Sequence, residues 1–160
     1  FELNNMSDII TNVTQTFEYD ILDKHIQLII DLAKHNSLEI CVDREKIKQV
    51  LSNLLHNAIK FTPERGTITI SATANDKCLQ IEITDTGIGI PTDKLEKIFD
   101  RFYQVDSSLT RRAGGAGIGL NIVKTYIDLH GGTVKAISEL GKGTSFICTL
   151  PKTNNGASND

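Results

Sequence analysis

The sequence contains no tryptophan, only three cysteines and three prolines, and few aromatic residues of any kind. The cysteines, Cys41, Cys78 and Cys148, stand singly within apolar stretches that are typical of strands. Isolated cysteines in such positions are typical of buried, reduced thiols, so we expect neither a disulfide framework nor a cysteine metal cluster. This use of cysteine predicts a cytosolic protein.

The sequence also lacks an excess of one charge and any long apolar run. With 17 basic and 20 acidic residues, the formal net charge is −3, which gives no reason to expect a nucleic-acid partner or contact with a membrane. No apolar run approaches the ~20 residues that span a bilayer, and no secretory leader is recognisable. We expect one domain at residues 1–151 and a flexible tail at 152–160. Because the chain begins at Phe1 and not at Met, we expect a piece of a longer protein.

The apolar periodicity predicts helices and strands in alternating groups, with Ser7 and Asp43 as helix N-caps. Helices are expected at residues 6–22, 44–62, 91–99 and 118–130. Strands are expected at residues 26–32, 38–42, 67–74, 78–85, 133–138 and 144–150. Residues 101–116 show no period, which predicts a mobile loop. This order predicts an α+β fold, a two-layer α/β sandwich with a mixed sheet and helices on one face.

The central predicted helix carries a polar stripe beside its apolar face. Asn53, Asn57 and Lys60 recur at i, i+4 and i+7, and therefore lie along one line. Asparagine is a poor helix former, so a merely solvated stripe would more readily use Glu, Lys or Gln. Two amide oxygens and one cation suit a hydrated Mg²⁺ and the phosphates beside it. The alternative is the ordinary polar flank of an amphipathic helix.

Asp85 ends a strand in which Leu79, Ile81 and Ile83 share one parity, and it has the same parity. Its carboxylate should therefore point toward the buried side of the sheet, where a charge needs hydrogen-bond donors. One interpretation is a cap on the glycine turn that follows. The other is that Asp85 accepts a hydrogen bond from a ligand amino group, such as that of adenine. Thr144 has the inward parity of its own strand.

Three glycines, Gly115, Gly117 and Gly119, lie at the start of the last predicted helix. A flexible turn is the usual meaning of such a run. Before a helix, however, glycines let the backbone approach a ligand closely, and the free amides of the helix N-terminus favour phosphate. The run is neither a Rossmann fingerprint nor a P-loop, because no strand feeds it directly and no Gly-Lys-Ser/Thr follows.

Together, these stretches resemble the ATP-binding catalytic domain of sensor histidine kinases, within the wider family that includes gyrase and heat-shock chaperone ATPases. The resemblance covers nearly the whole chain. The family's N box, first glycine box, F box, second glycine box and last glycine box correspond to residues 53–63, 85–91, 98–103, 115–120 and 141–146. The resemblance implies a Bergerat-type ATP-binding fold, the cofactors ATP and Mg²⁺, and a lid at about 104–116 that orders when nucleotide binds.

The resemblance also implies roles for individual residues. Asn57 would ligate Mg²⁺ with help from Asn53, and Lys60 would contact phosphate. Phe61 would line the adenine pocket, and Asp85 would bind the adenine amine. The other cofactor-binding residues implied are Gly87, Gly89, Arg111, Arg112, Gly115, Gly117, Gly119, Leu120 and Thr144.

Two positions depart from the family pattern. Gln104 stands where many members carry a phosphate-binding arginine, so Arg111 or Arg112 would have to supply that charge. Ala116 stands where threonine is common, which removes one hydroxyl near the phosphates but leaves the backbone site.

The implied activity is transfer of the γ-phosphoryl group of ATP to a histidine. The family's acceptor histidine precedes an acidic residue, whereas the four histidines here precede Ile26, Asn36, Asn57 and Gly131. His56 and His130 are interpreted as an N-box residue and a helix-end residue. The acceptor is therefore expected on a separate dimerisation domain, and residues 1–3 resemble the segment just after that domain.

The expected partners are ATP or ADP, the dimerisation and phosphoacceptor domain of the same protein, and a response regulator receiver domain. Two alternatives remain open, a nucleotide-gated conformational ATPase and a nucleotide-binding scaffold without kinase activity. The hydrolysing relatives place a glutamate base where this chain has Asn53, which disfavours the first alternative.

Overall fold

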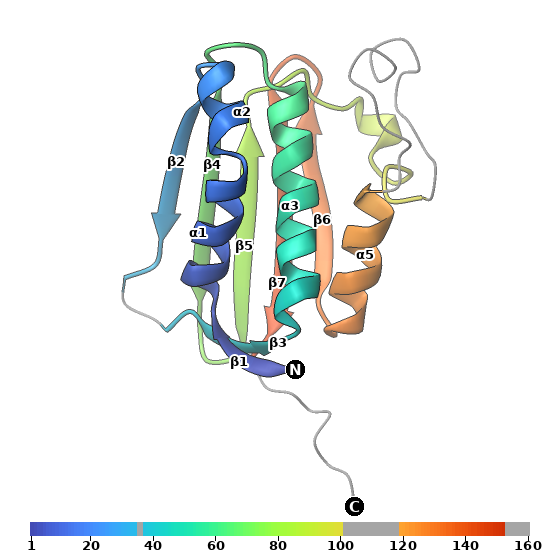
Figure 1. Cartoon of the computed structure of the whole chain (residues 1–160). Helices are drawn as coiled ribbons and strands as arrows, with labels where there is room; N and C mark the ends of the chain where they lie inside the picture. The colour runs from blue at the N-terminus through green and yellow to red at the C-terminus, as the bar shows by residue number, and fades with distance from the viewer. Residues whose placement is uncertain (35–36, 101–118, 153–160) are drawn as a thin grey trace, which may run out of the picture.

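The computed structural model describes residues 1–34, 37–100 and 119–152. The domain has two layers, a β-sheet and a layer of helices that covers one face of the sheet (Figure 1). The helices are α1 (Met6–Thr16), α2 (Glu18–Asp23), α3 (Arg44–Phe61) and α5 (Gly119–Leu129), with a 3-10 turn η1 (Thr92–Lys94). The strands are β1 (Glu2–Asn5), β2 (Gln27–Leu32), β3 (Glu39–Val42), β4 (Thr67–Ala74), β5 (Cys78–Asp85), β6 (Thr133–Glu139) and β7 (Gly143–Pro151).

The main sheet has the strand order β2-β4-β5-β7-β6. Strands β2 and β4 are parallel, whereas each of the other neighbouring pairs is antiparallel. The helices α1, α3 and α5 all lie on the same side of this sheet (Figure 1). The predicted fold class, a two-layer α+β sandwich with a mixed sheet, is therefore confirmed.

The core forms between the helices and the inward face of the sheet, because apolar side chains alternate along the strands. On β5, Leu79, Ile81 and Ile83 are buried. Helix α3 adds the buried residues Ile47, Val50, Leu51, Leu54, Leu55, Ala58 and Ile59.

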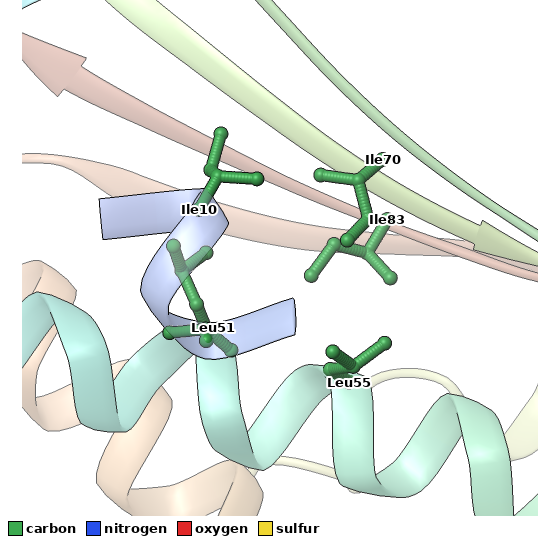
Figure 2. A pocket seen from close by; sticks show the side chains of 6 residues that line it. Ile10, Leu51, Leu55, Ile70 and Ile83 are labelled. Carbon is green, nitrogen blue, oxygen red and sulfur yellow. The ribbon is translucent and has the colours of Figure 1, made fainter. Parts of the chain in front are cut away.

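A cavity of about 10 Å³ remains in this core, lined by apolar side chains that include Ile10, Leu51 and Ile83 (Figure 2). A small, wholly apolar gap offers a ligand no hydrogen bond and is far smaller than a cofactor site. We therefore place the functional site elsewhere.

The first helical segment differs from its prediction. A helix was expected over 6–22, but α1 ends at Thr16 and α2 begins at Glu18, with Phe17 between them. The Phe17 amide donates to Thr14 O at 3.2 Å, which tightens the last turn of α1 and ends it. Ser7 is not the N-cap, because Asn5 accepts from the Ser7 amide at 2.9 Å and so starts the helix two residues earlier.

The N-cap of α3 is predicted correctly, because the Asp43 side chain accepts from the Lys46 amide at 3.2 Å. The helix expected at 91–99 is only the 3-10 turn η1, followed by turns up to residue 99. Ile98 is the one buried side chain between residues 91 and 99, so little apolar burial is available to stabilise a full helix there.

Strand β1 was not predicted, and the sequence left the partners of β2 and β3 open. In the structure, β1 pairs with β3 in a separate two-stranded sheet, and β2 pairs with β4. The sequence of β1, Glu2-Leu-Asn-Asn5, is mostly polar and exposed, so it has no alternating pattern to mark it as a strand.

At the C-terminal side, the Lys152 amide donates to Lys77 O and its Nζ donates to Ser37 O, both at 2.8 Å. The rest of the expected tail and the expected lid at 104–116 lie outside the described residues. Within the described ranges, none of the helices combines the length and apolarity needed to cross a bilayer.

Candidate functional site

One end of the domain brings together three segments that are distant in the sequence. The C-terminal end of α3, the turn after β5 and the β6–β7 turn lie at this same end (Figure 1). Backbone hydrogen bonds join them, since Ile88 N donates to Phe61 O at 3.3 Å and Gly141 N donates to Ile88 O at 2.7 Å. Predicted site residues from all three segments are therefore neighbours.

Two glycines of the turn after β5 make this close approach possible. A Cβ atom on Gly87 would lie 2.5 Å from Phe61 O, and one on Gly89 would lie 2.1 Å from Glu139 O. Gly89 also has a φ of +75°, in the left-handed region that favours glycine. The glycine turn is thus a requirement of the backbone packing at this end of the domain.

Asp85 is buried, with 7% of its surface exposed, which confirms the prediction from strand parity. The Gly87 amide donates to Asp85 Oδ1 at 2.8 Å, so the carboxylate does cap the glycine turn. Burial raises the pKa of Asp85, and the backbone amides of Gly87 and Thr144 oppose that rise. A carboxylate has about four acceptor sites, so Asp85 can cap the turn and still accept from a ligand.

A row of polar side chains crosses the sheet beside Asp85. Thr144 of β7 lies opposite Asp85, and Ser138 of β6 lies opposite Thr144. Thr144 is 7% exposed, and its Oγ1 lies 2.9 Å from Ser138 Oγ. Ser138 was not among the predicted site residues. Its inward parity on β6, shared with Val134 and Ala136, could have identified it.

The polar stripe on α3 is half-buried rather than fully solvated. Asn53 Nδ2 donates to Gly119 O at 3.2 Å, which ties α3 to the start of α5 and leaves the Asn53 Oδ1 atom as an acceptor. Partial burial lowers the pKa of Lys60, and its Nζ lies 5.4 Å from the centroid of the Phe61 ring.

A lysine from outside the predicted site holds the C-terminal end of α3. Lys24 Nζ donates to the carbonyls of Ile59 at 2.7 Å, Lys60 at 3.3 Å and Thr62 at 2.9 Å. A cation there satisfies carbonyls that have no helical partner and complements the helix dipole. This contact spans 35 residues of sequence or more, so no local pattern could reveal it.

Comparison with known proteins identifies the family to which the chain belongs. A family model described as "Histidine kinase-, DNA gyrase B-, and HSP90-like ATPase" matches residues 42–154. The chain belongs to this ATPase family. The match includes α3, β5 and β7, the elements that carry the stripe, Asp85 and Thr144.

Individual relatives place the chain among the histidine kinases of this family. The chain is 44% identical over 131 residues to the sensor histidine kinase WalK of Bacillus subtilis, covering 81% of this chain and 21% of WalK. It therefore spans about a fifth of that relative. The solved catalytic domain of the histidine kinase ThkA matches with a TM-score of 0.84 and 32% identity, covering 96% of each chain. The chain is a histidine kinase catalytic domain.

A second ThkA structure, in complex with the response regulator protein TrrA, matches with a TM-score of 0.77 and 30% identity. The match covers 96% of this chain and 42% of that one.

The predicted site residues of this histidine kinase domain fall into two groups. Those at the shared end of the sheet are Phe61, Asp85, Gly87, Gly89 and Thr144. The others lie on α3 (Asn53, Asn57 and Lys60) and at the start of α5 (Gly119 and Leu120), which the Asn53–Gly119 hydrogen bond joins. Arg111, Arg112, Gly115 and Gly117 lie outside the described residues.

Metal binding in this domain would depend on amide oxygens. Among the described residues there is no group of three or more His, Cys, Asp or Glu side chains that could hold a metal ion. The Asn53 and Asn57 oxygens fit Mg²⁺ nonetheless, because Mg²⁺ takes few protein ligands and keeps several waters.

Proposed function

We propose that this domain binds Mg-ATP and transfers its γ-phosphoryl group to a histidine on a dimerisation domain of the same protein. The observation that carries the proposal is the buried Asp85 carboxylate in a domain of the ATPase family. This carboxylate accepts from Gly87, which packs against the C-terminal end of α3 at Phe61 O. A buried acceptor at this place suits the exocyclic amine of adenine, with Phe61 and Thr144 beside it.

The stripe on α3 supplies the other half of the proposal. Asn57, with the Asn53 Oδ1 atom, would hold Mg²⁺, and Lys60 would contact phosphate. The bound Mg²⁺ would neutralise charge that develops on the phosphates during transfer. The start of α5 at Gly119 and Leu120 would face the phosphates, together with Arg111, Arg112, Gly115 and Gly117.

The three histidines that the structure describes are poor candidates for the phosphate acceptor. His130 is buried and has both ring nitrogens engaged, since Asp43 N donates to Nε2 at 3.1 Å and Nδ1 lies 2.7 Å from Tyr126 O. His56 is fixed on α3, inside the domain that would have to deliver phosphate to it. His25 is exposed beside Glu64 but precedes an isoleucine.

The partners proposed are therefore the dimerisation domain and a response regulator receiver domain, on the cytoplasmic side of the cell. The complex of ThkA with TrrA supports the second partner. Unassisted hydrolysis of ATP is not expected, because the Asn53 amide nitrogen is bonded to Gly119 O and an amide cannot accept a proton from water.

Incubation with γ-labelled ATP and Mg²⁺ tests this function. The domain alone should remain unlabelled, and acid-labile label should appear on the dimerisation domain when that domain is added in trans. Label on this chain would contradict the acceptor assignment. Rapid phosphate release without label would favour a conformational ATPase, and tight binding with neither product would favour a scaffold.

A further inference from the structure

Ser138 connects three parts of the site through a single hydroxyl group. Its Oγ lies 2.7 Å from Gly143 O, 2.7 Å from Ile90 N and 2.9 Å from Thr144 Oγ1. Ile90 follows the glycine turn after β5, and Gly143 and Thr144 begin β7. Ser138 also lies in the cross-sheet row with Thr144 and Asp85.

The direction of each hydrogen bond follows from the chemistry of the partners. A carbonyl only accepts, so Ser138 must donate its single proton to Gly143 O. A backbone amide only donates, so Ser138 accepts from Ile90 N. The remaining contact can then form only if Thr144 donates its own hydroxyl proton to Ser138. Thr144 is left with lone pairs alone for any other partner.

We propose that Ser138 is a positioning residue that makes Thr144 an acceptor-only group and thereby favours adenine over 6-oxopurines. This inference rests on the proposed function, in which the purine base lies against Asp85 and Thr144. The row then offers two acceptors, the Asp85 carboxylate and the Thr144 hydroxyl oxygen. The 6-amino group of adenine donates hydrogen bonds, whereas the 6-oxo group of hypoxanthine can only accept them. Two facing acceptors repel, so the row disfavours hypoxanthine.

Calorimetric titration with ADP and with inosine diphosphate tests the proposal through the ratio of the two dissociation constants. Ser138→Ala releases the Thr144 proton, which can then turn toward a 6-oxo group. The preference for ADP should fall by about two- to tenfold, the worth of one hydrogen bond. Ser138→Thr keeps the hydroxyl and should keep the wild-type ratio.

Ser145→Ala is the matched control. Its Oγ lies 2.7 Å from Thr84 Oγ1, and it alternates with Thr144 along β7, so it faces the other side of the sheet. This variant should keep the wild-type ratio. If Ser138→Ala does not fold, Ser138→Cys preserves the volume, and its weakly hydrogen-bonding thiol should reduce the preference in the same direction.

Equal weakening of ADP and inosine diphosphate in Ser138→Ala or Ser138→Cys would overturn the proposal and leave a purely structural serine. A changed ratio in Ser138→Thr would also overturn it. Asp85→Asn, titrated in parallel, separates the two levels of inference. If Asp85→Asn weakens ADP binding but Ser138→Ala keeps the wild-type ratio of the two dissociation constants, only this inference fails. If Asp85→Asn does not change ADP binding, the proposed adenine site itself is wrong.

Discussion

The two halves of the candidate site are built in different ways. At the sheet end, Asp85, Thr144 and Ser138 are fixed by hydrogen bonds to the backbone or to each other across three strands. Along α3, Asn53 bonds to Gly119 O, whereas Asn57 and Lys60 have no side-chain hydrogen bond to another described residue. The sheet side is therefore fixed before any ligand binds. If the proposed function is correct, the base site is preformed, whereas the phosphate site is completed by the metal and the nucleotide.

The largest expected effect is on stability at the sheet end. Gly89→Ala should lower the free energy of unfolding by about 2–5 kcal/mol, because it combines left-handed strain with a methyl group placed against Glu139 O. Gly141→Ala is the matched control, since Gly141 also has a positive φ, +84°, but open space around its Cβ position. Gly141→Ala should lower the free energy of unfolding only by the left-handed backbone strain, about 1–2 kcal/mol.

Gly119→Ala extends the comparison to the contact between α3 and α5, where the new Cβ would lie 3.7 Å from Asn53 Cγ, an ordinary van der Waals distance. The free energy of unfolding of this variant should therefore differ little from that of the wild type. Urea denaturation of the three variants measures all these differences. Equal losses for Gly89→Ala and Gly141→Ala would show that the turn has room to adjust, and the sheet end would not be as tightly fixed as proposed.

The next effect concerns binding of the base. Asp85→Asn should weaken ATP and ADP by about 1–3 kcal/mol, because an amide replaces the acceptor that the adenine amine needs. The fold should survive, since the asparagine carbonyl can still accept from the Gly87 amide. Isothermal titration calorimetry measures the affinity for ATP and ADP. An unchanged affinity would show that Asp85 does not take part in adenine binding.

A smaller effect is expected on the Mg²⁺ dependence of ATP binding. Asn57→Ala should abolish the strengthening of ATP binding by Mg²⁺, a loss of about tenfold, or about 1.4 kcal/mol. Titrations with Mg²⁺ and with EDTA measure it. Asn12→Ala is the control, because Asn12 is an exposed helical asparagine on α1. If Asn57→Ala keeps the Mg²⁺ dependence of the wild type, the stripe is only a polar flank.

The smallest effect is the pH dependence of stability. Because burial raises the folded-state pKa of Asp85 above its ordinary value of 3.8, its stabilising contribution is complete below that value. The contribution is lost as the pH rises through the folded-state pKa. Asp85→Asn should therefore raise the melting temperature of the nucleotide-free domain at pH 7, and the gain should shrink as the pH falls toward 4. A gain that grows at low pH would contradict a raised pKa.

The sequence was a good guide where a repeating pattern decides the structure. Alternation along β5 located the buried Asp85, and the helical period of α3 located the stripe and its N-cap Asp43. The carboxylate's role as a turn cap was one of two open interpretations. Only the three-dimensional structure showed that Gly87 donates to it.

The contacts that the sequence missed all depend on pairings between distant segments. Lys24 reaches the end of α3 because β2 and β4 are parallel neighbours, and β1 exists because β3 offers it an edge. Ser138 becomes important only through the register that sets it opposite Thr144. Propensity and periodicity describe single elements, and they carry no information about which elements meet.

The most direct test of this account is a crystal structure of the domain with Mg²⁺ and a non-hydrolysable ATP analogue. The adenine amine should lie within hydrogen-bond distance of Asp85, and Mg²⁺ should be bound to the Asn57 oxygen at about 2.0–2.1 Å. Between the free and bound domains, Asp85, Thr144 and Ser138 should keep their positions, while Asn57 and Lys60 gain their partners. An adenine bound away from Asp85, or a sheet end rebuilt on binding, would contradict the preformed base site.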